Sequence, residues 1–345
     1  MTAPAHRHVV LYDLGTTSAD LIHVLSKAGF TVSVIEPDPD DAARVGAVLG
    51  RRLPDLELRV DSAVPMHCDV FVCHVVGAGQ APQGALGVVL DGPRALAGLT
   101  DPARAVAMEL LDPRLVEVSF GSASADARQM AVEFVKSLDV PFMQSRGDAF
   151  AGTVLQDAAL ALVDRLLLVG VTPWELDEAL EDAGFSEGLL KAQDHIGLDV
   201  AFARRRAAGT DLLVADRMVR EGRLGRSIGV GWYRYPGGGG AVIDPLMEDM
   251  IVEEARFARI DQMPVTAAEA ADALIVGVMN AASGMLQSGV TPQELDQLAF
   301  YKLGLPDITV RARSMGQAAV EQRLRNLHAV HPTLWAPSPA LSLLF

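Results

Sequence analysis

A glycine and a glutamate 21 residues apart form the first pattern in this chain that could do chemistry. Gly15 follows a short apolar stretch, and Glu36 ends a second one. A strand, a glycine-containing turn, a helix and a strand that ends in an acid form the order of a dinucleotide-binding unit. In such a unit the acid binds the ribose hydroxyls, which favours NAD over NADP. The candidate cofactor-binding residues are Asp13, Gly15, Thr16, Thr17, Ser18 and Glu36.

The glycine fingerprint of this turn is incomplete. The pattern G-x-G-x-x-G/A is Asp13-Leu14-Gly15-Thr16-Thr17-Ser18 here, so only its middle glycine is present. Ser18 is small enough to preserve helix–strand packing. Asp13 places a carboxylate near the expected pyrophosphate, where repulsion between like charges weakens binding unless the charge is neutralised. Two interpretations stay open, a site that binds NAD and a nucleotide-binding fold that is retained as a scaffold.

Short apolar strands alternate with helices in the first part of the chain. Nearly continuous apolar strands of this kind favour a parallel sheet covered on both faces. We therefore assign residues 1–147 to a divergent, Rossmann-like NAD(P)-binding domain. We expect strands at 8–13, 31–36, 69–76, 87–90 and 115–120, and helices at 17–28 and 40–53.

An octapeptide occurs twice in the second part of the chain. Gly170–Asp177 and Gly289–Asp296 share seven of eight residues in the pattern Gly-Val-Thr-Pro-x-Glu-Leu-Asp, at an offset of 119 residues. Each copy has a threonine that can cap a helix, proline at the first helical position and glutamate three residues after the cap, which is a capping box. The match indicates an internal duplication. The alternative is two unrelated helix starts that use the same turn chemistry.

The expected fold is therefore an α/β Rossmann-like N-terminal domain followed by two duplicated all-α domains. A glycine-rich break at residues 236–240 separates the copies, so we place the helical domains at 148–238 and 239–345. Apolar helices around 154–169 and 273–286 either pack between the repeats or form an interface in a homodimer.

Acidic side chains outnumber basic ones. The 345 residues include 44 Asp and Glu against 29 Lys and Arg, a formal net charge of −15. Nucleic-acid binding needs clustered basic side chains that face phosphates, so we expect no nucleic-acid partner. Basic residues do gather at Arg204–Arg206 and Arg217–Arg226. Each cluster is either a solvated helix face or a pocket for an anionic ligand.

Cysteine usage and hydropathy indicate the compartment. Cys68 and Cys73 lie on one apparent strand, where a spacing of five residues directs them to opposite faces. They have neither the spacing of a metal site nor that of a disulfide framework, and we expect no metal. The first eight residues contain no apolar signal core, and no apolar run reaches membrane-spanning length. We therefore expect a cytoplasmic protein with no membrane partner.

A segment of the helical region resembles a hallmark of the 3-hydroxyacyl-CoA dehydrogenases. Residues 221–235 (EGRLGRSIGVGWYRY) are similar to the family pattern G-R-x-G-x-K-x-G-x-G-F-Y-x-Y, with Ser227 for the lysine and Trp232 for the phenylalanine. The two octapeptides and residues 194–199 (DHIGLD) resemble further family segments. The tandem helical units and the tail at 334–341 are similar to the dehydrogenase half of fatty-acid oxidation α-subunits, without their enoyl-CoA hydratase half.

The resemblance implies oxidation of the 3-hydroxyl of an acyl-CoA by hydride transfer to NAD. In the family a histidine is the general base and a glutamate orients it. The glutamate falls on Glu117, in Leu-Val-Glu-Val. The histidine opens an H-F-F-N-P motif, and Glu109 stands there in Glu109-Leu-Leu-Asp-Pro113. The family's active-site asparagine falls on Thr153, and its substrate-contacting serine, which falls within residues 90–93, is missing. The acid after the fourth strand is replaced by Cys73.

Two side chains could replace the missing base. Glu109 could act if burial raised its pKa, and its alternative is a solvated loop residue. His74 follows a strand at the nucleotide edge of the sheet, and its alternative is a structural histidine. The candidate catalytic residues are Glu117, Glu109 and His74. The candidate contacts for CoA are Arg223, Arg226 and Thr153.

Two functional hypotheses follow. The first is an NAD-dependent 3-hydroxyacyl-CoA dehydrogenase of fatty-acid β-oxidation with divergent site chemistry. The second is a non-catalytic subunit that binds acyl-CoA or partners enzymes of β-oxidation or aromatic degradation. Loss of a general base alone costs ~10²–10⁴ in rate, so the sequence favours the second hypothesis.

Overall fold

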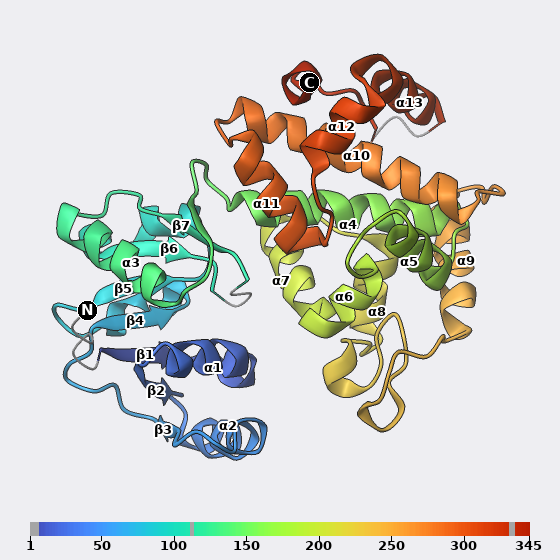
Figure 1. The fold of residues 1–345 in the computed structure, drawn as a ribbon. Helices are drawn as coiled ribbons and strands as arrows, with labels where there is room; N and C mark the ends of the chain where they lie inside the picture. Colours follow the sequence, from blue (N-terminus) through green and yellow to red (C-terminus); the bar gives the residue numbers. More distant parts are fainter. Residues whose placement is uncertain (1–6, 111–113, 331–334) are drawn as a thin grey trace. The chain divides into compact units, whose positions relative to one another are not determined.

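The computed structural model describes residues 7–110, 114–330 and 335–345, which form two compact units, Met1–Ala151 and Gly152–Phe345 (Figure 1). The start of the chain at residues 1–6 and part of the Glu109–Pro113 motif therefore lie outside the described residues. We describe each unit by itself.

The first unit contains an eight-stranded sheet in the order β3-β2-β1-β4-β5-β6-β7-β8. Neighbouring strands pair in parallel except β6 and β7, which pair antiparallel. Residues 109–115 between those two strands are too few for a crossover helix, so β7 returns antiparallel and the sheet is not wholly parallel. The strands are β1 His8–Tyr12, β2 Thr31–Ile35, β3 Arg59–Asp61, β4 Val70–Cys73, β5 Leu86–Val89, β6 Ala105–Met108, β7 Val116–Ser119 and β8 Phe142–Gln144.

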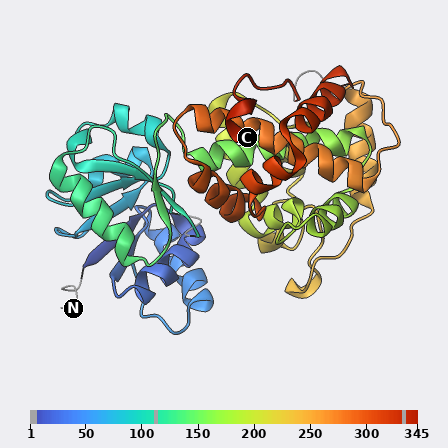
Figure 2. The same ribbon diagram turned by 45° about the horizontal axis from the view of Figure 1, so that its top comes forward.

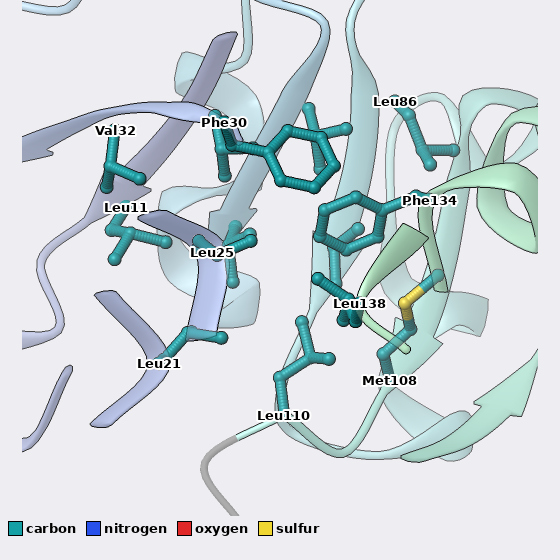
Figure 3. Packing of buried hydrophobic residues seen from close by; sticks show 14 of the residues in the cluster. Leu11, Leu21, Leu25, Phe30, Val32, Leu86, Met108, Leu110, Phe134 and Leu138 are labelled. Carbon is teal, nitrogen blue, oxygen red and sulfur yellow. The ribbon is translucent and has the colours of Figure 1, made fainter. Parts of the chain in front are cut away.

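Three α-helices cover one face of this sheet. They are α1 Ala19–Lys27, α2 Pro39–Arg52 and α3 Ala125–Ser137, and their apolar residues join the strands in the main hydrophobic cluster. Figure 3 shows Phe30 against Phe134 in that cluster, edge to face with ring centroids 5.5 Å apart. The opposite face is covered by short 3₁₀ turns, chiefly η2 Val75–Gln80 and η3 Pro93–Gly98, instead of α-helices.

The two cysteines lie on the same side of the sheet, contrary to the prediction. β4 begins at Val70, so Cys68 precedes the strand and the alternation of side chains does not apply to it. Cys68 instead packs against the cluster that contains Cys73, and both thiols are free.

The second unit is helical, and Figure 2 shows it without strand arrows. Its α-helices are α4 Ala151–Val169, α5 Pro173–Asp182, α6 Leu189–Ile196, α7 Leu198–Ala208, α8 Leu213–Arg220, α9 Leu246–Phe257, α10 Ala267–Gln287, α11 Pro292–Leu303, α12 Ile308–Met315 and α13 Gln317–Val330. Among the described residues, no helix combines the length and apolarity needed to cross a bilayer.

Helix α10 is the centre of this unit. It packs against α5, α11 and α13. It also approaches α4 so closely that a Cβ at Gly277 would lie 2.7 Å from Cδ1 of Leu162. The apolar faces of α4 and α10 are thus buried within the unit. Asn280 of α10 holds the tail, because its Nδ2 donates to the Ala336 carbonyl and its Oδ1 accepts from Ser338 N–H, both at 2.8 Å.

Both octapeptides fold as predicted. Thr172 with Glu175 and Thr291 with Glu294 form capping boxes at the starts of α5 and α11.

The matched geometry continues past the octapeptides. Asp177 accepts a hydrogen bond from Leu190 N–H at 3.0 Å, and Asp296 accepts one from Thr309 N–H at 2.9 Å, 13 residues further along in each case. Glycines with positive φ end α6 and α12, also at an offset of 119 residues, Gly197 and Gly316. These contacts support our proposal that the helical unit is duplicated. The division at residue 238 stays a prediction.

Candidate functional site

The predicted nucleotide turn brings Gly15 and Glu36 into direct contact. Gly15 follows β1, and its N–H donates to Oε1 of Glu36, which follows β2, at 2.8 Å. Glu36 is buried, and this burial raises the pKa of its carboxyl despite the hydrogen bond from Gly15. Ser18 closes the turn, because its hydroxyl donates to the Gly15 carbonyl at 2.7 Å.

The backbone of this turn is open at Gly15. Gly15 has a φ of +59°, and nothing lies within 4 Å of the position that its Cβ would occupy. Thr16 and Thr17 lie in the 3₁₀ turn Gly15–Ser18, which leads into α1. Open space over a glycine, a helix start and an acid at the end of β2 fit a dinucleotide. Asp13 is exposed, and its backbone has the left-handed conformation, with a φ of 55°. Its carboxylate therefore remains at the sheet edge where a pyrophosphate would approach.

His74 and Asp91 form a pair at the same edge of the sheet. His74 directly follows β4, and Asp91 follows the neighbouring parallel strand β5. Nδ1 of His74 lies 3.1 Å from Oδ1 of Asp91, while Oδ2 of Asp91 accepts a hydrogen bond from Val75 N–H. The hydrogen bond to Asp91 raises the pKa of His74. Sequence reasoning missed Asp91, because an aspartate in Leu-Asp-Gly-Pro has the composition of a turn.

Glu117 is fully buried on β7 and is bonded to the backbone. Its Oε2 accepts from Ala151 N–H, where α4 begins, at 2.7 Å. Its own carbonyl accepts from Glu109 N–H at 3.0 Å. A carboxylate at a helix start satisfies an otherwise orphan N–H, so this contact gives Glu117 a structural role that needs no histidine beside it.

The predicted CoA contacts are spread along the helical unit. Arg223 is buried, donating to Asp244 Oδ2 and to the Gly231 carbonyl, both at 2.7 Å, so its charge is already neutralised within the fold. Arg226 stays at the surface, with its guanidinium 5.8 Å from the centre of the Tyr235 ring. Thr153 is half-buried near the start of α4.

The segments that carry the family resemblance meet around Asp194. This buried carboxylate accepts from Trp232 N–H at 2.8 Å, Tyr233 N–H at 2.9 Å and the Tyr235 hydroxyl at 3.0 Å. A Cβ at Gly231 would lie 1.8 Å from Asp194 Oδ1, so only glycine fits there. We name Asp194 and residues 231–235 the Asp194 clamp.

Asp177 makes stability depend on pH. It accepts from Leu190 N–H, Lys191 N–H and the Tyr233 hydroxyl, but burial raises the pKa of its carboxyl to about 7, against an ordinary value of 3.8. Between these values the unfolded chain releases a proton that the folded chain keeps. The contribution of Asp177 to stability is therefore full below about pH 4 and is lost as the pH rises to about 7.

We expect Asp177→Asn to remove this dependence. Urea midpoints at pH 4, 5.5 and 7 should fall less steeply with rising pH in the variant than in the wild type. Equal slopes in the two proteins would contradict the assignment to Asp177. Asp296→Asn, at the matching position of the second copy, is the control.

The first part of the helical unit matches a known family model. Residues 150–235, which include the Asp194 clamp, match the model of the 3-hydroxyacyl-CoA dehydrogenase C-terminal domain. The chain carries a 3-hydroxyacyl-CoA dehydrogenase C-terminal domain at these residues. Relatives include the peroxisomal bifunctional enzyme of Danio rerio, 26% identical over 292 residues, which cover 75% of this chain and 40% of that protein. The peroxisomal bifunctional enzyme of Homo sapiens is 24% identical over 49% of this chain and 27% of its own length. The chain thus spans two fifths or less of these relatives.

Solved structures of family members share the fold. The dehydrogenase part of multifunctional enzyme 1 from C. elegans aligns with a TM-score of 0.66 and 17% identity, over 99% of this chain and 89% of that one. The 3-hydroxybutyryl-CoA dehydrogenase of Escherichia coli aligns with a TM-score of 0.69 and 17% identity, over 98% of each chain.

Proposed function

We propose that this protein binds NAD at the Gly15–Glu36 turn and oxidises the 3-hydroxyl of an acyl-CoA in fatty-acid β-oxidation. The observation that carries the proposal is the open turn itself. Gly15 leaves space at the carboxyl edge of β1, and Glu36 is held against it at 2.8 Å at the end of β2. Nucleotides bind outside the carboxyl ends of strands in sheets of this topology. When bound, NAD would supply the hydride acceptor.

Individual residues would divide the binding between them. Gly15 would let the backbone approach the pyrophosphate, and Glu36 would accept from the ribose hydroxyls. Arg226, at the surface of the helical unit, remains a candidate for a CoA phosphate, and Thr153 remains a candidate contact for CoA.

A second candidate function is a non-catalytic acyl-CoA-binding partner of other β-oxidation enzymes. Glu117 favours it, because its carboxylate bonds to Ala151 N–H and glutamate occupies the histidine position at residue 109.

Binding of NADH tests the first proposal through a matched pair of glycine variants. Gly15 and Gly29 both have positive φ and open space around the missing Cβ, but Gly29 lies at the opposite, amino-terminal end of β2. Either glycine to alanine should cost about 1–2 kcal/mol of stability through the same strain. Only Gly15→Ala should also reduce the rise in melting temperature that NADH produces.

The readout is a thermal-shift titration with NADH, then with acetoacetyl-CoA. No shift of the wild type with NADH would refute the NAD-dependent proposal. A shift with acetoacetyl-CoA alone would then support the non-catalytic partner.

A further inference from the structure

We propose that His74 is the catalytic base of this site and that Asp91 is its positioning residue. The inference rests on the proposed NAD-dependent oxidation and names the base that this oxidation requires. The proposed base follows β4, and its positioning residue follows β5. Glu117 keeps its structural role at the start of α4.

The position of His74 follows from the strand order. The chain moves outward from β1 through β2 to β3 and then returns to the other side of β1 as β4, so the order reverses between β1 and β4. Ligands of doubly wound sheets bind at this reversal, beyond the carboxyl ends of the strands. Tyr12 at the end of β1 pairs with Cys73 at the end of β4. The next residues, Asp13 and His74, therefore flank the reversal, and Gly15 lies two residues beyond Asp13.

The hydrogen bonds of the pair determine which nitrogen is available. Nδ1 of His74 faces Oδ1 of Asp91 at 3.1 Å, so in the neutral ring the proton lies on Nδ1 and the lone pair on Nε2. Val75 N–H fixes the other carboxylate oxygen. The His74 side chain is 44% exposed, which leaves the ring accessible to a substrate.

The charges around His74 support a base. Asp91, at the end of β5, and Asp13, at the end of β1, are the charged groups that act on it. Both are carboxylates and favour the imidazolium that forms when His74 takes a proton. Burial raises the pKa of Asp91, but the hydrogen bonds from His74 and Val75 outweigh it and lower that pKa overall. Asp91 therefore stays ionised while His74 titrates.

The proposed step balances as an alcohol oxidation. Nε2 of His74 takes the proton of the 3-hydroxyl as the O–H bond breaks. The C3–H bond breaks with its electron pair, the hydride passes to the nicotinamide dinucleotide, and the C3–O bond becomes a carbonyl. The 3-hydroxyacyl thioester is oxidised, the dinucleotide is reduced, and the resulting imidazolium is stabilised by Asp91.

The first test observes the pair without turnover. The imidazole of His74 is titrated by NMR in the intact 345-residue chain, with His74→Gln to assign its signal. We expect a pKa above the ordinary value of 6.5 in the wild type and a lower one in Asp91→Asn. A His74 pKa that does not change in Asp91→Asn would overturn the pair.

The second test measures turnover. His74→Gln should lower kcat for oxidation of 3-hydroxybutyryl-CoA by ~10²–10⁴ with little change in KM. Asp91→Asn should lower kcat by at least ~10-fold and move the acid limb of the pH profile to lower pH, because the base loses its partner carboxylate. His67→Gln, at an exposed histidine of the same unit, is the control and should match the wild type.

The two proposals can fail separately. A wild-type chain that binds NADH, with a His74→Gln variant of unchanged kcat, overturns the base and leaves the dinucleotide site standing. A wild type that binds NADH without turnover likewise overturns the base. A wild type that does not bind NADH refutes the proposed function together with this inference.

Discussion

Replacing Asp194 with alanine is expected to lower the free energy of unfolding of the helical unit by at least about 3 kcal/mol. The substitution leaves the backbone N–H groups of Trp232 and Tyr233 and the hydroxyl of Tyr235 without their acceptor. Each is buried, and an unsatisfied buried polar group costs about 1–3 kcal/mol. Part of this cost is offset, because burial raises the pKa of Asp194 to about 6 and its charge is itself unfavourable there.

Urea unfolding followed by tryptophan fluorescence measures this loss, since Trp232 is 1% exposed. Asp211→Ala removes the same charge at an exposed position and should change stability by less than about 0.5 kcal/mol. Asp194→Asn keeps one acceptor oxygen, so its loss of stability should lie between those of Asp194→Ala and Asp211→Ala. An Asp194→Ala variant as stable as Asp211→Ala would show that the Asp194 clamp does not hold residues 231–235.

The buried pair of Arg205 and Asp216 should respond differently to one substitution and to two. Nε of Arg205 donates to Oδ1 of Asp216 at 2.8 Å, and the side chains are 8% and 0% exposed. Arg205→Met leaves an uncompensated buried carboxylate and should cost about 3–5 kcal/mol. Adding Asp216→Leu removes that carboxylate, so the double variant should regain most of the loss. Oδ2 of Asp216, which has no hydrogen-bond partner among the described residues, already adds to the cost of the charge.

The measurement is a double-variant cycle of unfolding free energies at pH 7. Arg206→Met, at the exposed neighbour of Arg205, is the control for loss of an arginine from α7. A double variant that is less stable than Arg205→Met alone would contradict the prediction, because it would mean that the buried carboxylate is favourable without its partner.

The sequence predicted the parts of the fold that follow from local patterns. The apolar runs of β1, β2, β4, β5 and β7 and the capping boxes of α5 and α11 each depend on a few adjacent residues. The strands β3, β6 and β8 were not predicted. Arg59–Asp61 and Phe142–Gln144 are three residues long and only partly apolar, and Ala105–Met108 is four residues long with alanine at two of its positions. Such segments become strands only when a longer neighbour pairs with them.

The candidate site likewise contains features that local sequence patterns predict and others that they do not. Gly15 and Glu36 were predicted to belong to one dinucleotide-binding unit, and they lie in contact because the carboxyl ends of adjacent parallel strands meet at one edge. The contact of His74 with Asp91 depends on the register of β4 and β5, which no local pattern specifies. Arg223 belongs to a basic cluster, and composition alone cannot distinguish a phosphate contact from an ion pair with Asp244, 21 residues further along.

The offset of 119 residues has a consequence for how the chain can change over time. Asp296 lies 119 residues after Asp177, and each carboxylate accepts a hydrogen bond from the backbone N–H 13 residues further along the chain. The residue 119 positions after Asp194 is Arg313, however, so under the proposed duplication a cation stands where the first copy has the acceptor at the centre of the Asp194 clamp. Selection can therefore act on the two copies separately. Substitutions at Arg313 should be widely tolerated, whereas those at Asp194 should be removed.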